Sequence, residues 1–222
     1  MDSRIQAILN FVDGEKVADI GADHGYLSIE LIKSGRAIKV IATEKNLGPF
    51  EALSKNVSGV ANIEVRLGDG LKVLSAGEVD TICIAGMGGA LIVKILNDSP
   101  EVVKSSQRLI LQPQNATKKI RDWLTENHWT IADEDLAESA GIIYEIICAE
   151  KNPSEKIFKR VSSPLLKKFL TQRLEKLQRV LEEMSKSSQA HTSEKFLATQ
   201  SAVEVLRKRI NLLSDFTSRR NF

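Results

Sequence analysis

The chain contains 222 residues, of which 42% are hydrophobic and 27% charged, and its formal net charge at pH 7 is +2. This length allows one α/β domain with a packed core and a smaller appendage. No apolar run approaches the roughly 18 to 20 residues that a membrane span requires, and no cleavable hydrophobic segment follows Met1, so we expect a soluble, cytoplasmic protein without a membrane partner.

The first expected element is an amphipathic helix over residues 3–12. Its apolar positions have the spacing i, i+3, i+4, i+7 and are Ile5, Ile8, Leu9 and Val12. Arg4 lies on this helix, where it either faces solvent or reaches the carboxylate of a bound cofactor.

Residues 17–26 predict a buried strand, a turn with two glycines and the start of a helix that continues over residues 27–33. Gly21 and Gly25 allow positive φ and let a ligand approach the backbone. Ligands of open α/β sheets bind at such carboxyl ends of strands. We therefore expect a ligand site at this turn.

The acidic residues of the turn bear on the kind of ligand. Asp23 and Tyr26 stand where a dinucleotide-binding fingerprint requires glycine. Two carboxylates, Asp19 and Asp23, repel a phosphate and attract a cation. S-adenosylmethionine fits this preference, because it carries a sulfonium and an ammonium group and no phosphate. An ordinary tight turn between strand and helix fits the segment equally well.

The next two expected strands also end in acidic residues. Residues 38–43 lead to Glu44, about 20 residues after the glycine turn, where such folds place an acid against ribose hydroxyls. Lys45 follows it and is a further candidate for cofactor binding. Residues 63–67 lead to Asp69, which stands between two glycines and is the candidate contact for an adenine amino group, with Gly70 beside it. A solvated turn is the commoner place for such acids.

Glycines follow the fourth expected strand, residues 81–85. Ala85 and Gly86 are candidate cofactor-binding residues. Gly86, Met87 and Gly88 would form the floor of the active site, where methyl donor and acceptor meet. Ligand-type loops after successive strands are hard to obtain by accident. Gln112 and Pro113 end the fifth strand at the same edge, so the Gln112 amide could read the Watson–Crick edge of an adenine.

Three ring-bearing side chains have more than one interpretation. His24 either hydrogen-bonds a cofactor carboxylate or caps its own turn. Tyr26 could pack against cofactor or base, whereas Tyr144 is expected in the core.

Strands and helices alternate to about residue 136, and residues 141–149 supply a last apolar strand. This alternation predicts a mostly parallel sheet with helices on both faces. Cys83 and Cys148 lie in apolar runs without Cys or His at ligand spacing, which indicates two buried free thiols and no metal site.

The order of these loops resembles that of class I methyltransferases. Four segments are similar to the bacterial tRNA adenine-N1 methyltransferase family called TrmK: Ala-Asp-Ile-Gly-Ala-Asp-His-Gly-Tyr-Leu, Arg-Leu-Gly-Asp-Gly-Leu, Ile-Ala-Gly-Met-Gly-Gly and Leu-Ile-Leu-Gln-Pro. The resemblance covers residues 1–150 and, in general character, a helical C-terminal part. It implies a Rossmann-like sheet with an antiparallel last strand, S-adenosylmethionine as cofactor and tRNA as partner. That family usually reads Gln-Pro-Asn, whereas residues 112–115 read Gln-Pro-Gln-Asn, so the role of Gln114 is left open.

The pattern changes after residue 152, which divides the chain into an expected cofactor domain, 1–152, and a helical domain, 153–222. Apolar residues recur in alternating steps of four and three, with Thr199 filling one position of the second run; they are Leu170, Leu174, Leu177, Leu181 and Met184, then Phe196, Val203, Leu206, Ile210 and Leu213. Residues 185–193 between the two runs are polar. The pattern predicts an antiparallel helical hairpin of coiled-coil type. A stabilising or dimerising appendage is the simplest interpretation, and we expect a monomer or weak dimer.

Charge is distributed unevenly between the two parts. Residues 1–150 contain 15 Lys and Arg against 22 Asp and Glu, and residues 151–222 contain 16 against 7. A basic appendage beside an acidic domain is typical of a grip on a phosphate backbone. The candidate RNA-binding residues are Lys167, Lys168, Arg173, Lys176, Arg179, Arg207, Lys208 and Arg209. Charged helix faces often only face solvent, so the expectation that tRNA is the partner depends on the family resemblance.

The resulting hypothesis is a methyltransferase that acts on N1 of adenine 22 in tRNA, where base, atom and position come from the resemblance. N1 has a free lone pair at neutral pH, so alignment within about 3 to 3.5 Å of the methyl carbon is needed and a strong base is not. One alternative is a methyltransferase for a small molecule or protein. Another is a non-catalytic RNA-binding module that senses S-adenosylmethionine.

Overall fold

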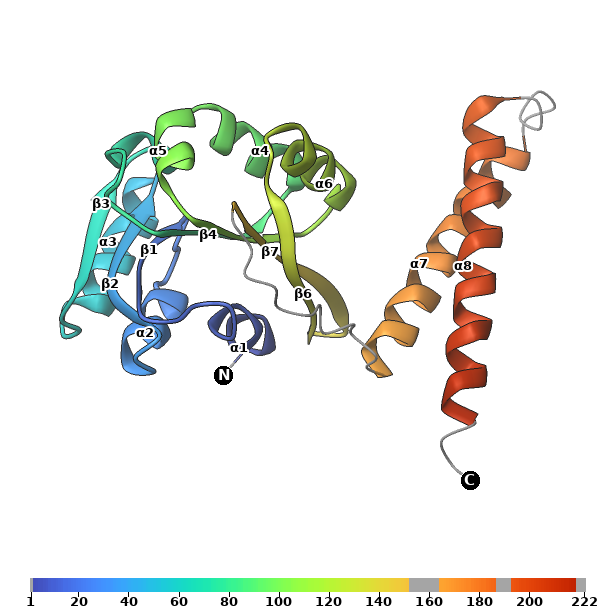
Figure 1. The fold of residues 1–222 in the computed structure, drawn as a ribbon, viewed down its shortest axis with the longest axis horizontal. Helices are drawn as coiled ribbons and strands as arrows, with labels where there is room; N and C mark the ends of the chain where they lie inside the picture. Colours follow the sequence, from blue (N-terminus) through green and yellow to red (C-terminus); the bar gives the residue numbers. More distant parts are fainter. Residues whose placement is uncertain (1, 152–163, 187–192, 219–222) are drawn as a thin grey trace. The chain divides into compact units, whose positions relative to one another are not determined.

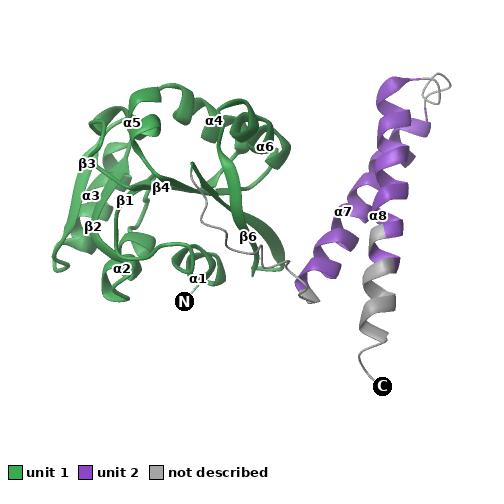
Figure 2. Cartoon of the chain, in the orientation of Figure 1, with its two compact units in different colours: residues 1–160 green, residues 161–222 purple. Residues whose placement is uncertain are grey.

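The computed structural model describes residues 2–151, 164–186 and 193–218 (Figure 1). The chain divides into two compact units, 1–160 and 161–222 (Figure 2). The boundary expected at residues 152 and 153 falls outside the described residues and stays a prediction.

Seven strands of the first unit form one sheet in the order β3-β2-β1-β4-β5-β7-β6. The strands are β1 (Glu15–Ile20), β2 (Ala37–Glu44), β3 (Ile63–Leu67), β4 (Thr81–Met87), β5 (Arg108–Pro113), β6 (Thr130–Ser139) and β7 (Ile142–Glu150). The first five pair in parallel, while β7 pairs antiparallel with both β5 and β6. The mostly parallel sheet with an antiparallel last strand is confirmed.

β6 is the strand that the sequence did not predict. It contains several acidic residues, which are depleted in strands, and most of its side chains are only half-buried. Its pairing with β7 supplies the stabilisation that local propensity lacks. The two strands are joined at Ala140 and Gly141, whose φ angles of 49° and 77° are those of a tight two-residue hairpin turn.

Helices cover both faces of the sheet, as expected (Figure 1). One face carries α1 (Ser3–Leu9), α2 (Tyr26–Lys33) and α3 (Leu47–Val57); the other carries α4 (Gly89–Asn97), α5 (Pro100–Ser105) and α6 (Thr117–Glu126), with a short 3-10 helix η1 (Gly70–Val73). The prediction of a helix to residue 12 was wrong: α1 ends at Leu9, and turn hydrogen bonds from Phe11 and Val12 to Ile8 and Leu9 bury Val12 without another helical turn.

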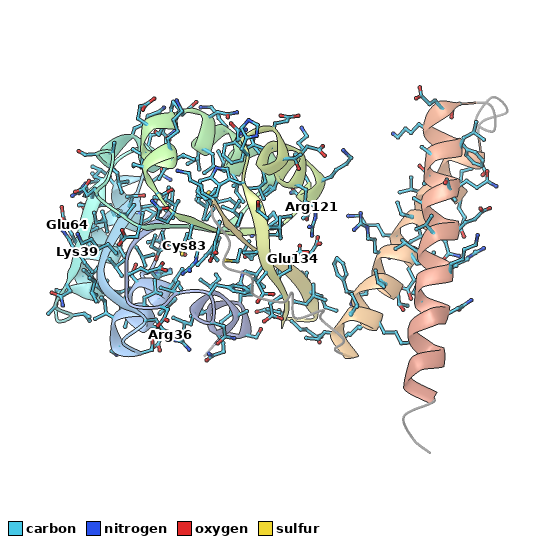
Figure 3. The ribbon with its side chains drawn as sticks, viewed as in Figure 1. Arg36, Lys39, Glu64, Cys83, Arg121 and Glu134 are labelled. Carbon is cyan, nitrogen blue, oxygen red and sulfur yellow. The ribbon has the colours of Figure 1, made fainter. Side chains whose placement is uncertain are left out.

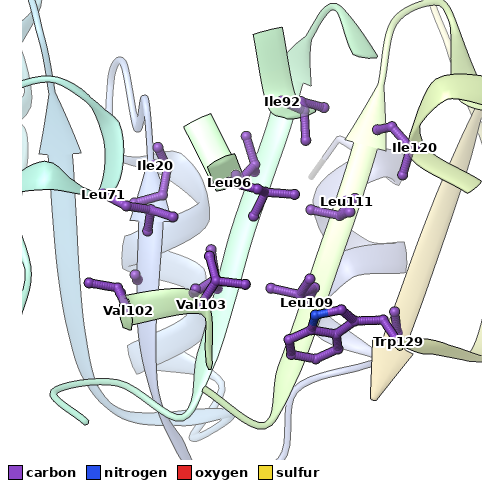
Figure 4. Close-up of a cluster of buried hydrophobic side chains, with 14 of the residues drawn as sticks. Ile20, Leu71, Ile92, Leu96, Val102, Val103, Leu109, Leu111, Ile120 and Trp129 are labelled. Carbon is purple, nitrogen blue, oxygen red and sulfur yellow. The ribbon is translucent and has the colours of Figure 1, made fainter. Parts of the chain in front are cut away.

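The core consists of two apolar layers, because side chains of a strand alternate between the faces of its sheet. Ile82 and Ile84 belong to the layer under α4, α5 and α6, whereas Cys83 between them belongs to the layer under α1 and α2. Figure 4 shows the first layer, which includes Ile92 of α4 and Leu109 of β5.

The two cysteines are buried and free, which confirms the prediction for both thiols. Cys83 lies on β4 in the interior of the first unit (Figure 3). Burial raises the pKa of the Cys148 thiol to about 12 and that of Cys83 well above its ordinary value. Neither thiol is therefore ionised near neutral pH.

The second unit is an antiparallel hairpin of α7 (Pro164–Ser185) and α8 (Glu194–Ser218) (Figure 2). The buried and half-buried positions include Leu170, Leu174, Leu177, Leu181, Met184, Phe196, Val203, Leu206 and Ile210. These are the positions that the heptad pattern predicted for the seam; the Leu213 side chain lies outside the described residues. The hairpin is confirmed, whereas supercoiling as a true coiled coil stays a prediction.

None of the helices in the described ranges combines the length and apolarity that crossing a membrane requires.

Candidate functional site

The glycine turn between β1 and α2 lies against two neighbouring strands. The N–H groups of Gly21 and Ala22 donate hydrogen bonds to the Thr43 carbonyl of β2, at 2.9 and 3.0 Å. Gly21 has a φ of 69°, and a Cβ added there would lie 2.2 Å from Cε of Met87. The positive φ favours glycine at this position, whereas the Met87 methyl is the end of a flexible side chain that could move aside.

Gly25 is the second glycine that this turn requires. It has a φ of 76° and precedes α2 without a side-chain cap. A Cβ at Gly25 would lie 2.6 Å from Leu53 and 2.9 Å from Val57, both on α3. The Ser28 N–H in the first turn of α2 is bonded to the Asp19 carboxylate, so an anionic group such as a cofactor carboxylate would meet the N–H groups of Tyr26 and Leu27.

The side chains that follow Gly21 face solvent. Asp23 has a φ of 51° and a side chain 71% exposed, and its carboxylate lies 3.9 Å from Nε2 of His24. The His24 and Tyr26 rings lie 5.7 Å apart between centroids, and Tyr26 is 61% exposed. The predicted candidates in this turn are thus brought together, and Tyr26 presents an accessible ring.

Asp19 differs from this arrangement, because it points into the domain. Its carboxylate accepts a hydrogen bond of 2.6 Å from the Ser28 hydroxyl of α2, and the residue is 4% exposed. Burial, only partly offset by the Ser28 hydrogen bonds, raises the pKa of Asp19 to about 6. The hypothesis that both carboxylates face the ligand is therefore wrong for Asp19, and for Asp23 it stays a prediction.

The pKa of Asp19 leads to a stability prediction for the ligand-free protein. The pKa of Asp19 is higher in the folded protein than in the unfolded chain, where it is about 3.9. The protonated carboxyl therefore contributes its full stabilisation below pH 3.9, and this stabilisation is lost as the pH rises through about 6. The full loss amounts to about 3 kcal/mol, of which about 2 kcal/mol falls between pH 4.5 and 7.5, and we expect Asp19→Asn to remove it. Urea unfolding of the wild type and of Asp19→Asn at pH 4.5 and 7.5 measures this effect. The difference between their free energies of unfolding should change between the two pH values. An equal pH response of wild type and variant would refute the assignment.

Glu44 ends β2 with one carboxylate oxygen engaged and one available. Its Oε1 accepts hydrogen bonds from the N–H groups of Lys45 and Asn46, at 2.9 and 3.1 Å, and the residue is 8% exposed. These bonds fix the orientation of the carboxylate, whose other oxygen can accept from a ribose hydroxyl. The hydroxyl of Thr43 is buried without a hydrogen-bond partner among the described residues. Buried hydroxyl groups without a partner are uncommon in folded proteins.

Asp69 follows β3 and is held by two lysines. Its carboxylate oxygens lie 3.2 Å from Nζ of Lys45 and 2.9 Å from Nζ of Lys72. Hydrogen bonds from Lys72 and Lys45 lower the pKa of Asp69 below its ordinary value. Gly70, with a φ of 62°, brings the chain close to Ile95 of α4. The predicted adenine contact is thus ionised and already paired, so adenine would share it with Lys45 and Lys72.

The β4 and β5 loops are joined by Gln112. The side-chain oxygen of Gln112 accepts a hydrogen bond of 3.0 Å from the N–H of Gly86, and its amide nitrogen donates to the carbonyl of Pro113 at 3.1 Å. Gln112 is 1% exposed. In this structure its amide holds the Gly86 turn, and reading an adenine edge would require it to leave both partners.

The residues after Pro113 lie directly on the glycines after β4. The N–H of Gln114 donates to the carbonyl of Met87 at 2.8 Å, and that of Gly89 donates to the carbonyl of Asn115 at 3.1 Å. A Cβ at Gly88 would lie 3.2 Å from Oδ1 of Asn115. The sequence did not assign Asn115 to the site; its position beside the shifted Gln-Pro-Asn motif was the one available signal.

Arg4 lies apart from these loops, against the β6–β7 hairpin. Its Nη2 atom pairs with the Asp2 carboxylate at 2.7 Å, and its guanidinium lies 5.2 Å from the centroid of the Tyr144 ring. Asp2 also accepts a hydrogen bond from Ser139. Both Arg4 contacts are made within the folded domain. Contact with a cofactor carboxylate stays a prediction, and such a contact would compete with Asp2 and Tyr144 for the guanidinium.

Exposed apolar side chains at the carboxyl edge were also not predicted. Leu47 is the first residue of α3, Leu67 ends β3, and Leu91 lies in the first turn of α4; they are 59%, 46% and 49% exposed. Such accessible apolar surface beside polar groups suits a flat aromatic ligand. In the described part of the chain, no group of three or more His, Cys, Asp or Glu is arranged to hold a metal ion.

The basic side chains of the hairpin are accessible where the structure describes them. The exposed candidates are Lys167, Lys168, Arg173, Lys176, Arg179, Arg207 and Lys208. The Arg209 side chain lies outside the described residues.

Comparison with known proteins agrees with this architecture. The family model described as "Methyltransferase domain" matches residues 1–147. The tRNA (adenine(22)-N(1))-methyltransferase of Bacillus subtilis is 36% identical over 207 residues, which cover 85% of this chain and 87% of that protein. The chain belongs to the TrmK family.

Solved structures of related proteins extend the similarity to nearly the whole chain. Bacillus subtilis TrmK has a TM-score of 0.75 at 31% identity, with 97% of each chain covered. Streptococcus pneumoniae Sp1610 in complex with S-adenosyl-L-methionine has a TM-score of 0.79 at 30% identity, with 95% of this chain and 100% of that chain covered. The TrmK fold therefore includes both units of this chain.

Proposed function

We propose that the protein transfers a methyl group from S-adenosylmethionine to N1 of an adenine in tRNA, the adenine at position 22. The relationship to the Bacillus subtilis enzyme of this activity carries the proposal. The arrangement of loops at one edge of the sheet supports it, because four successive strands end in glycines, carboxylates or both.

The residues at this edge fit the cofactor, which supplies an electrophilic methyl group on a sulfonium. The available oxygen of Glu44 would accept from the ribose, and Asp69 would lie at the adenine amino group with Lys45 and Gly70 beside it. Gly21, Asp23, His24, Gly25 and Tyr26 would surround the methionine part, where Asp23 offers negative charge to the ammonium group. Ala85 and Gly86 would line the methyl-bearing side.

The chemistry requires alignment more than acid–base catalysis. The N1 lone pair forms the new bond to the methyl carbon, while the electrons of the carbon–sulfur bond remain on sulfur as the thioether. N1 needs no prior deprotonation, so positioning supplies most of the rate. The Gly86–Gly88 turn, held by Gln112 and closed by Pro113, would form the rigid floor for this approach. Acidic groups nearby would stabilise the positive charge that N1-methyladenine carries.

The basic hairpin would bind the tRNA backbone, and the exposed cations on α7 and α8 support this role. We place the protein in the cytoplasm, where tRNA is modified, and expect a monomer or weak dimer that needs no metal ion.

The decisive experiment is the transfer of labelled methyl from S-adenosylmethionine to unmodified bulk tRNA, followed by nucleoside analysis of the digest. We expect labelled N1-methyladenosine. Label in a protein or small molecule would indicate the first alternative. Binding of both S-adenosylmethionine and tRNA without transfer would indicate the sensor. Substitution of the target adenine then maps the position.

The contribution of the hairpin is tested by the salt dependence of tRNA binding. We expect Arg207→Gln with Lys208→Gln to reduce the slope of log K against log salt by about 1 to 2, because each lost phosphate contact accounts for roughly 0.7 to 0.9. Fluorescence titrations at several salt concentrations measure the slope. Lys33→Gln with Lys55→Gln removes the same charge from exposed positions on α2 and α3 and serves as the control. Equal slopes for the two double variants would show that Arg207 and Lys208 make no phosphate contacts and only face solvent.

A further inference from the structure

Two amide side chains follow Pro113, and the structure separates their surroundings. Gln114 and Asn115 are both exposed, in contrast to the buried Gln112. The Asn115 amide lies beside the floor of the site, since its Oδ1 and Nδ2 atoms are 3.2 and 3.6 Å from the position of a Gly88 Cβ. No side chain stands between Gly88 and this amide, because Gly88 has none.

The main chain holds this amide in place. Asn115 and the preceding Gln114 are hydrogen-bonded to the β4 loop through Gly89 and Met87. Gly89 contacts the same segment so closely that a Cβ there would lie 2.8 Å from the carbonyl oxygen of Asn115. The Asn115 side chain is thus an accessible polar group on a fixed backbone, which is the arrangement that recognition of a base requires.

The chemistry of an asparagine amide matches one edge of adenine. Its oxygen can accept a hydrogen bond from the N6 amino group while its nitrogen donates to N7, a two-point contact that selects adenine. Neither bond uses N1, so the nucleophile remains free to meet the methyl group. Guanine would present a carbonyl oxygen to the amide oxygen and lose one bond.

We infer that Asn115 recognises the target adenine through N6 and N7, beside the Gly86–Gly88 floor. This inference rests on the proposed function and deepens it. It assigns to Asn115 the recognition of adenine that the sequence alone suggested for Gln112. Gln112 then acts as a positioning residue for the Gly86 turn.

The test is a cycle of variants and substrates with the full-length protein. Asn115→Ala removes the amide, Asn115→Asp keeps an acceptor but replaces the donor, and Gln114→Ala is the matched control on the neighbouring exposed position. The substrates are unmodified tRNA and the same tRNA with 7-deazaadenosine at the target, which lacks the N7 acceptor and keeps N1 and N6. The measured quantities are kcat/KM for each pair and the Kd for S-adenosylmethionine.

We expect Asn115→Ala and Asn115→Asp to lower kcat/KM on unmodified tRNA about 10- to 100-fold, with Gln114→Ala within about 3-fold of wild type. The 7-deaza substrate should lower wild-type kcat/KM by about 10-fold, and Asn115→Asp should lose nothing further on it, because the same hydrogen bond is already absent. Cofactor affinity should be unchanged in all variants.

Multiplicative losses in the cycle would overturn the inference, as would a loss confined to Gln114→Ala or wild-type activity in Asn115→Ala. Failure of the wild-type protein to methylate unmodified tRNA would instead overturn the proposed function. The two failures are therefore distinguishable in one experiment.

Discussion

Gly89→Ala is expected to lower kcat for tRNA methylation at least 100-fold. The added Cβ would lie 2.7 Å from the carbonyl oxygen of Ala116 and 2.8 Å from that of Asn115. Both are backbone atoms, so the clash is relieved only by moving the β5–α6 loop away from the β4–α4 loop. That movement would break the hydrogen bond from the Gly89 N–H to Asn115 and displace the floor of the site. A displacement of about 1 Å is enough for a 100-fold loss.

The measurement is steady-state kcat with saturating tRNA, accompanied by cofactor titration and thermal unfolding. Gly48→Ala is the matched control, because a Cβ at this helical position on α3 meets no atom within 4 Å. We expect the control to keep full activity. Activity of Gly89→Ala within 3-fold of wild type would show that contact between the two loops is not required.

Glu44→Gln is expected to weaken S-adenosylmethionine binding about 10- to 100-fold without unfolding the protein. The amide keeps one acceptor for the N–H groups of Lys45 and Asn46 but replaces the second, available oxygen by a donor. A charge-assisted hydrogen bond to a ribose hydroxyl is worth about 1.5 to 3 kcal/mol, which corresponds to this range. Calorimetric titration measures the Kd.

S-adenosylhomocysteine should lose affinity to the same extent, since it has the same ribose and lacks only the methyl group. Glu51→Gln makes the same charge change at an exposed position on α3 and should leave both affinities unchanged. Loss of affinity for S-adenosylmethionine alone would indicate that Glu44 acts on the sulfonium charge. Unchanged affinity for both ligands would remove the ribose assignment.

Most secondary structure was predictable because it depends on local patterns. Strand residues such as Ile82, Cys83 and Ile84 are continuously apolar, as expected for a parallel sheet buried on both faces. The heptad spacing from Leu170 onward predicted the seam of the hairpin. β6 was missed, since its acidic sequence is stabilised by pairing with β7 rather than by its own propensity.

Side-chain orientation was less predictable than the position of each loop. Asp19 and Asp23 are two carboxylates of the same motif, yet Asp19 bonds Ser28 inside the domain and Asp23 faces solvent. Arg4 is committed to Asp2 and Tyr144, a partner on a strand far along the chain. Such choices depend on what packs opposite a residue, which a local pattern does not contain.

From the sequence alone follow the class of fold, the helical hairpin, the charge asymmetry and the edge of the sheet that holds the ligand loops. Each of these depends on residue spacing and on glycine positions along a short segment. The tertiary structure decided which polar groups at that edge are available. The side-chain oxygen of Gln112 accepts a hydrogen bond from the N–H of Gly86, 26 residues away, whereas the Asn115 amide remains accessible beside Gly88. Hydrogen bonding and burial between distant segments determine this difference, because they exist only once the strands are paired.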